Sequence, residues 1–325
     1  MIVVLTALGD AELGDFGVES PAYVAIRAVQ FAAMLAVVGA LMFRLIVVPA
    51  ALRQSTNSPV LVADLLRRVD RLAFRGMVAL GIVSLARFVA QHAAMFGTGA
   101  TWARTTIDAL LMQSTWGHGW MLGVAGGGVG ALAARHVEAT VGKAMLIVAT
   151  GALTVSLSLS GHPAAAPQPA LAIAVDALHV LGAGAWVGGV ACLAMIAIPL
   201  AMRDADNTGH RLLAHVVSAF GPVAIGGAIL VALTGGLAGW RNVGSIDALF
   251  TSPYGLRLLT KIGAVAVAAA IGAYNSRRIG PKLGDAAATA RLRRVIALEF
   301  AAMVVVIVVT AVLVASPFPG EGDGS

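Results

Sequence analysis

The stretch VIALEFAAMVVVIVVTAVLVA, residues 295–315, contains a single ionisable side chain, Glu299. A continuous apolar run of this length is typical of a helix that crosses the hydrocarbon core of a bilayer, which is about 30 Å thick. Other apolar runs of similar length precede it in the chain. Together they lie at residues 22–50, 74–96, 114–134, 142–161, 171–200, 214–239, 256–276 and 295–315. The sequence therefore predicts an all-α polytopic membrane protein, with about eight transmembrane helices in one bundle.

The composition of the whole chain supports this fold class. Of its 325 residues, 59% are hydrophobic and 12% are charged, whereas a soluble domain carries roughly 25% charged residues. A soluble enzyme and a disordered chain are thereby excluded. The net charge of +6 does not indicate nucleic acid, because the basic residues lie between apolar runs and form no patch with aromatic residues. The one cysteine, Cys192, excludes an intrachain disulfide.

Lys and Arg residues concentrate in alternate connections between the apolar runs. The segment between the first and second runs and the segment between the last two are the most basic. The positive-inside rule then places both termini outside the cytoplasm. We expect a multi-pass protein of the bacterial cytoplasmic (inner) membrane, surrounded by lipid, with extracytoplasmic tails at 1–20 and 316–325. The acidic N-terminal tail, which has no basic region, does not resemble a cleaved signal peptide.

The two halves of the chain share sequence features, which suggests two four-helix repeats of parallel orientation. We divide the chain into a first half, 21–161, and a second half, 162–315. The features that match at an offset of 150 residues are Gly39 with Gly189, Pro49 with Pro199 and Arg53 with Arg203. In addition, Ser114-Thr115-Trp116-Gly117 resembles Ser252-Pro253-Tyr254-Gly255.

Several histidines fall at one depth, near the outer ends of the predicted helices. They are His92, His118, His162 and His179, and Met95 and Met121 follow the first two at a spacing of three residues. Residues three apart share a helix face, and imidazole with thioether is a ligand set that suits copper, Cu(I) in particular. The sequence therefore predicts a metal site of these six residues. The alternative is that each histidine bonds a backbone carbonyl and each methionine fills the core.

Three charged residues inside the predicted spans could support such a site. Asp176 precedes His179 by three residues and could accept its second N–H. Lys261 could be a counter-charge to Asp176, and Glu299 could continue a polar path toward the cytoplasm. A local salt bridge with Arg293 or Arg294 would explain Glu299 equally well.

A set of short motifs resembles the copper resistance D (CopD/PcoD) family of membrane proteins. The motifs are Ser160-Gly161-His162, Asp176-x-x-His179, Trp186-x-Gly188-Gly189, Thr234-Gly235, Tyr254-Gly255-x-x-Leu258 before Lys261, Asn275-x-Arg277, and Glu299 before Pro317. The resemblance covers residues 150–318 well and the first four spans in general layout. It implies an inner-membrane copper transport protein that takes up copper from the periplasm and works with a small CopC-like periplasmic copper carrier. We expect that carrier to be a separate protein, since the tails are too short to contain it.

Two other functions stay open at this stage. Facing histidines on antiparallel helices could hold haem b, which would make the chain a membrane oxidoreductase. A copper sensor or assembly factor is a third class. The chain has no Walker motif and no P-type ATPase motif, so we expect a transporter that is not an enzyme. The oxidation state of copper, the energy coupling and a homo-oligomeric state are not determined.

Overall fold

The computed structural model describes residues 16–53, 58–137, 139–204 and 207–317, and in these segments all regular structure is helical. This confirms the prediction of an all-α polytopic membrane protein. In the described segments, seven helices are long and apolar enough to cross a membrane. The run predicted at 114–134 forms a helix but is not among the seven, because its histidine, tryptophans and glycines lower its hydropathy. A bundle of eight spans with both termini outside remains a prediction.

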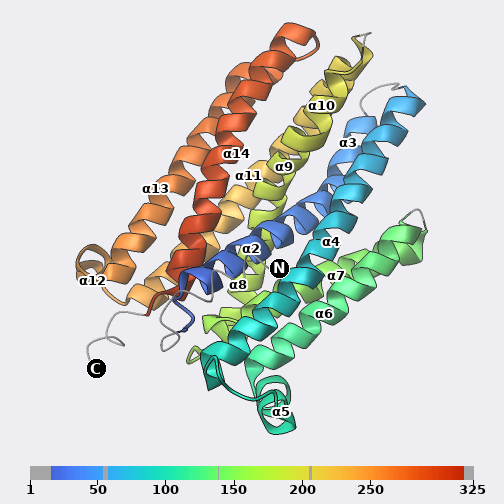
Figure 1. Ribbon diagram of the computed structural model, residues 1–325. Helices are drawn as coiled ribbons and strands as arrows, with labels where there is room; N and C mark the ends of the chain where they lie inside the picture. The colour runs from blue at the N-terminus through green and yellow to red at the C-terminus, as the bar shows by residue number, and fades with distance from the viewer. Residues whose placement is uncertain (1–15, 54–57, 138, 205–206, 318–325) are drawn as a thin grey trace.

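The first half of the chain contains four long helical segments (Figure 1). α2 (Pro21–Met42) continues through a π-helical turn, Phe43–Val47, into α3 (Val48–Leu52). α4 (Pro59–Phe96) is followed by the short α5 (Arg104–Met112), by α6 (Thr115–Ala133) and by α7 (Thr140–Leu159).

The second half follows the same order. A helical stretch comprises α8 (Pro169–Ala183), a π turn (Gly184–Gly188), α9 (Gly189–Cys192), a second π turn (Leu193–Ala197) and α10 (Ile198–Ala201). Then come α11 (Thr208–Val243), the short α12 (Ile246–Thr251), α13 (Pro253–Tyr274) with a π turn at Asn275–Ile279, and α14 (Ala286–Ala315). The short helices α5 and α12 were not predicted from the sequence.

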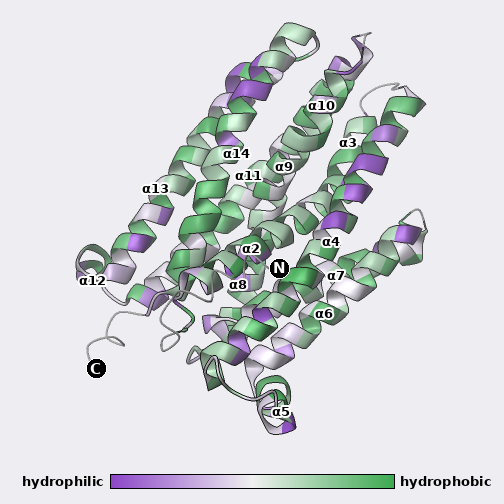
Figure 2. Ribbon diagram, viewed as in Figure 1, coloured by the Kyte–Doolittle hydropathy of each residue, from purple (hydrophilic) through white to green (hydrophobic). Residues whose placement is uncertain are grey.

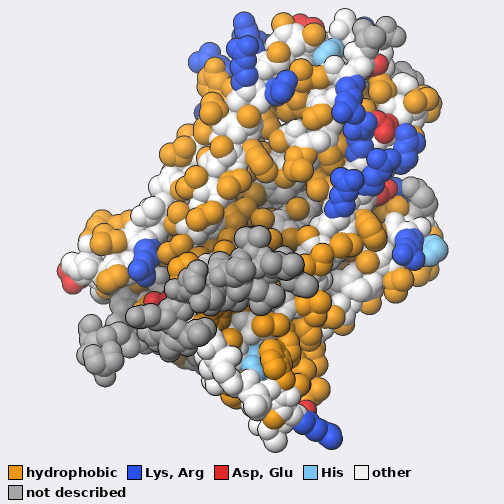
Figure 3. Space-filling view, in the orientation of Figure 1, with side chains coloured by type: hydrophobic (Ala, Val, Ile, Leu, Met, Phe, Trp, Pro, Cys, Tyr) orange, Lys and Arg blue, Asp and Glu red, His pale blue; other side chains and the backbone are white. Residues whose placement is uncertain are grey.

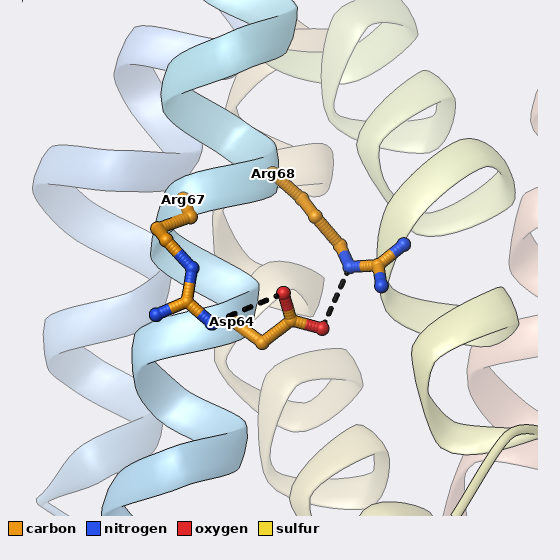
Figure 4. A network of polar contacts seen from close by, with 3 residues as sticks. All are labelled: Asp64, Arg67 and Arg68. Carbon is orange, nitrogen blue, oxygen red and sulfur yellow. Dashed lines mark hydrogen bonds and ion pairs between the residues drawn. The ribbon is translucent and has the colours of Figure 1, made fainter.

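α4 begins earlier than predicted, at Pro59 instead of residue 74. Its first turns are too polar for a hydropathy criterion, and ion pairs along the helix stabilise them. Asp64 accepts from Arg68 at 2.8 Å and from Arg67 at 3.4 Å (Figure 4). Figure 2 shows polar residues along this part of α4, and Figure 3 shows Lys and Arg gathered over it, beyond the apolar surface of the bundle.

α2 and the helical stretch from α8 to α10 form the centre of the bundle and are its most buried spans. They cross where Gly39 meets Gly188. A Cβ added to Gly39 would lie 2.3 Å from the Cα of Gly188, and one added to Gly188 would lie 2.1 Å from the carbonyl oxygen of Leu35. Small residues at such a crossing let two backbones approach closely, which is how membrane helices associate without a hydrophobic driving force.

Local structure recurs between the two halves. The π turn at Phe43–Val47 in the first half has a counterpart 150 residues later, at Leu193–Ala197. Ser114 caps α6 by accepting from the Gly117 N–H at 2.9 Å, and Ser252 caps α13 by accepting from the Gly255 N–H at 3.0 Å. The division of the chain into two related four-helix halves stays a prediction.

Candidate functional site

A cavity of about 580 Å³ opens between α2, α8, α11, α13 and α14. Its wall is mainly apolar, with a few polar and sulfur-containing side chains. Those that matter for chemistry are His162, Asp176, His179, Lys261, Tyr254, Met34 and Met303. The cavity therefore contains two of the four histidines predicted as ligands, and two of the three charged residues predicted to support them, Asp176 and Lys261.

The ring of His179 is held in one tautomer by α11. Its Nδ1 lies 3.0 Å from Oγ1 of Thr234, and that hydroxyl donates its own proton to the carbonyl of Leu230 at 2.5 Å. The hydroxyl must then accept from His179, so Nδ1 carries a proton, and the lone pair of the neutral ring lies on Nε2. The backbone of Val231 is a further partner of the ring, and its carbonyl oxygen lies 3.4 Å from the same hydroxyl. In its neutral form His179 can therefore bind a metal ion through Nε2.

Asp176 lies one turn before His179 on α8. Oγ of Ser158, at the end of α7, donates a hydrogen bond of 2.8 Å to its carboxylate. The role that the sequence suggested for Asp176, accepting the N–H of His179, belongs to Thr234 in the structure. Lys261 on α13 interacts electrostatically with both Asp176 and His179. A carboxylate and an ammonium group therefore accompany the imidazole in the same cavity.

Glu299 lies deeper in the bundle and is 3% exposed. Its carboxylate accepts from Nδ2 of Asn275 at 2.7 Å and from the side chain of Trp186. No ion pair with Arg293 or Arg294 occurs among the described residues. The local salt bridge considered from the sequence is therefore replaced by two neutral N–H donors. Trp186 also lines the cavity, so it connects Glu299 to it.

His92 and His118 lie elsewhere, around the short helix α5. Nε2 of His92 is 3.2 Å from Oγ1 of Thr106, and its ring stacks on Trp102 with centroids 4.0 Å apart. Nε2 of His118 is 3.1 Å from the carbonyl oxygen of Met112. Both contacts tie α5 to its neighbours α4 and α6. Neither histidine lines the cavity.

Like the histidines, some methionines line the cavity and others lie away from it. Met95 is 53% exposed and Met121 is partly exposed, and neither lines the cavity. Met34 on α2 and Met303 on α14 are buried and do line it. Sequence reasoning missed this pair because no nearby histidine marks either residue, and only the packing of α2 beside α14 places both at one cavity. Within the described segments, no three His, Cys, Asp or Glu side chains are close enough to hold a metal ion.

These features define a multi-pass helical membrane protein with a cavity between its helices that presents nitrogen and sulfur donors. Comparison with known families identifies it further. The profile for copper resistance protein D matches residues 214–313, and the profile for the copper resistance protein D-like N-terminal domain matches residues 18–170. The chain belongs to the copper resistance protein D family of bacterial membrane proteins, as its motifs suggested.

A similar curated protein is the copper transport protein CutJ of Bacillus subtilis (strain 168). The two are 27% identical over 276 residues, which cover 79% of this chain and 48% of CutJ. The chain thus spans about half the length of this relative. No solved structure matches the chain.

Proposed function

We propose that the protein transports copper across the cytoplasmic membrane, by uptake from the periplasm, and that the cavity beside His179 is the passage. The observation that carries this proposal is the free Nε2 lone pair of His179 in a cavity that also contains His162 and two thioethers, Met34 and Met303. Family membership and the similarity to CutJ support copper as the cargo.

The donor set suits a soft ion that must both enter and leave. Imidazole and thioether favour Cu(I) over hard cations such as Mg²⁺ and Ca²⁺. Asp176 contributes negative charge that attracts a cation, whereas the nearby Lys261 opposes its binding. Conduction requires a site that binds strongly enough for entry and weakly enough for release. The Asp176 and Lys261 pair would provide this balance.

An inward path would run from the cavity past Trp186 to Glu299. Trp186 lines the cavity and bonds the Glu299 carboxylate, and Met303 lies one turn from Glu299 on α14. In this scheme Glu299 is the next negative group that a cation meets after leaving the cavity. We further propose that a separate CopC-like carrier delivers copper to the outer end, in keeping with the resemblance described above.

The haem alternative has no support from the comparisons, which contain no haem protein. In the structure, His92 and His118 direct Nε2 to Thr106 and to the Met112 carbonyl. We therefore propose a transporter and not an oxidoreductase.

Copper binding by purified protein tests the proposal. His179→Ala should reduce the bound copper per chain, and Met303→Leu should weaken Cu(I) binding while keeping the volume of the side chain. A matched control exists on α11: His210 is buried and its Nδ1 lies 2.8 Å from Oγ1 of Thr289, away from the cavity. His210→Ala should leave copper binding unchanged. Unaltered binding in His179→Ala, or equal loss in both histidine variants, would contradict the proposal, and copper uptake into liposomes then measures transport itself.

A further inference from the structure

The first half of the bundle contains a second polar cluster, which the copper proposal does not use. Arg27 on α2 and Arg87 on α4 are 7% and 5% exposed. The two guanidinium groups are close enough to interact electrostatically, as like charges. Two buried positive charges in a membrane span are costly unless a negative group compensates them.

The position of Arg27 is set by hydrogen bonds on either side of it. Tyr23 donates to Oε1 of Gln91 on α4, and Arg87 donates from Nη1 to Oε1 of Gln30 at 2.9 Å. Tyr23, Arg27 and Gln30 have the spacing of one helix face, so Arg27 faces α4 between these two contacts. The Arg27 guanidinium also lies over the Tyr23 ring, at 4.8 Å from its centroid.

Arg87 extends the cluster to α6 and α7. Its Nη2 donates to the carbonyl of Ser160 at 2.8 Å, and its guanidinium lies over the Trp116 ring at 5.5 Å from the centroid. Ser160 precedes Gly161 and His162, which line the copper cavity. The cluster therefore lies next to the cavity but in the other half of the bundle.

Within the part of the chain that the structure describes, three N–H donors of this cluster are buried without a hydrogen-bond partner: Nη1 of Arg27, Nε of Arg87 and Nε1 of Trp116. Buried N–H groups are nearly always bonded, and an unsatisfied one destabilises the fold, a charged group most of all. Among the described residues, the arginines in ion pairs with carboxylates are Arg44, Arg67, Arg68 and Arg104. Arg27 and Arg87 have no such partner there. The described residues of the cluster thus have unused donors, net positive charge and no compensating acid.

The recurrent local structure relates this cluster to the copper cavity. Trp116 lies two residues after the cap Ser114, and Tyr254, which lines the cavity, lies two residues after the cap Ser252. Trp116 and Tyr254 thus occupy corresponding places in the two halves, and each contributes to one of the two polar regions. Their chemistry differs, since the cavity contains the carboxylate of Asp176 beside its cationic groups, whereas the cluster around Arg27 has unpartnered N–H donors and no carboxylate among the described residues.

We propose that Arg27, Arg87 and Trp116 form a binding site for a small anion. Guanidinium and indole N–H groups donate to chloride and to phosphate oxygens, and charge-assisted bonds of this kind are the stronger ones. The ligand is a halide or an oxyanion, which could be free in solution or be the phosphate of an anionic lipid. Such an anion would compensate the two arginine charges beside the passage that a copper cation takes.

Thermal unfolding of the detergent-purified full-length protein tests the site. We would titrate sodium chloride and inorganic phosphate against sodium gluconate at constant ionic strength. One of the two small anions should raise the Tm of the wild type in a saturable way. Arg27→Gln should abolish the dependence, and Arg27→Lys, which keeps the charge, should retain it at lower affinity. The control is Arg44→Gln, which removes an equally buried arginine that has a carboxylate partner, Asp70; it should lower the Tm and keep the anion dependence.

The same variants in nanodiscs distinguish the source of the anion. A Tm that rises with phosphatidylglycerol but not with free anions, and loses this rise in Arg27→Gln, would assign the site to a lipid phosphate. Two results would overturn the proposal. One is a wild-type Tm that responds to none of these anions, as expected if water satisfies the donors, and the other is a response that Arg27→Gln leaves intact.

Discussion

Nδ2 of Asn275 donates a hydrogen bond of 2.7 Å to Glu299 and so joins the π-helical turn after α13 to the buried face of α14. The carboxylate has no cationic partner among the ion pairs of the described residues. Glu299 is thus free of an ion pair there, and a cation on the path proposed above could interact with its carboxylate.

Replacing Glu299 by Gln removes this charge with little change in volume. We expect copper uptake into liposomes to fall by at least about tenfold, which is 1.4 kcal/mol in the barrier, while copper binding in the cavity stays near the wild-type value. Asp64→Asn is the control, because Asp64 pairs with surface arginines on α4 and its loss should not affect uptake. Normal uptake by Glu299→Gln would rule out the proposed path.

Replacing Thr234 by Val keeps the shape of the side chain and removes the acceptor for Nδ1 of His179. Partners that orient a ligating histidine typically contribute 10–100-fold in metal affinity. We expect copper affinity to fall by roughly that factor, and Thr234→Ser, which restores the hydroxyl, to recover most of it. Competition titration with a copper chelator measures both. Equal affinity in the Val variant and the wild type would show that the tautomer of His179 does not matter for binding.

Substituting Gly188 by Ala tests the central crossing of α2 and the α8–α10 stretch. The added Cβ would lie 2.1 Å from the Leu35 carbonyl oxygen, so the backbones must separate, at a cost typical of overpacking, about 1–3 kcal/mol. Tm and yield in detergent should drop. Gly81→Ala is the matched control, since nothing lies within 4 Å of its added Cβ, and helix propensity should make it neutral or stabilising. A neutral Gly188→Ala would mean that the helices are less tightly packed than described.

His92 was predicted from the sequence as a metal ligand, and its contacts with Thr106 and Trp102 favour a structural role. We expect His92→Gln to lower the Tm, because it breaks the stacking that holds α5, and to leave the bound copper per chain unchanged. Metal analysis of the purified variant decides between the two roles. Loss of one copper per chain would establish His92 as a ligand and require a second site near α5.

A visible absorption spectrum of the purified protein checks the haem alternative directly. We expect no Soret band, because Nε2 of His92 and Nε2 of His118 already have oxygen partners, at 3.2 Å and 3.1 Å. A Soret band that His92→Gln or His118→Ala removes would reverse this expectation.

Much of the architecture follows from the sequence alone. The backbone polar groups of an apolar run such as 295–315 find no water to bond in lipid. A helix is therefore the expected structure, because it bonds every backbone polar group within its own segment. The polar start of α4 and the short helices α5 and α12 could not be predicted from apolar runs. Ion pairs and contacts with neighbouring helices stabilise them, and neither is visible in a hydropathy pattern.

The candidate site, too, could be predicted only in part from the sequence. Hydropathy and histidine position determined the helical membrane fold and indicated His162, Asp176, His179 and Lys261, because depth along a span can be counted in residues. Only the tertiary structure decided that His92 and His118 tie down α5, that Thr234 orients His179, and that Met34 and Met303 enter the cavity. Rotation of each helix about its axis and the close crossing at Gly39 and Gly188 determine which side chains meet, and both depend on packing between segments far apart in the chain.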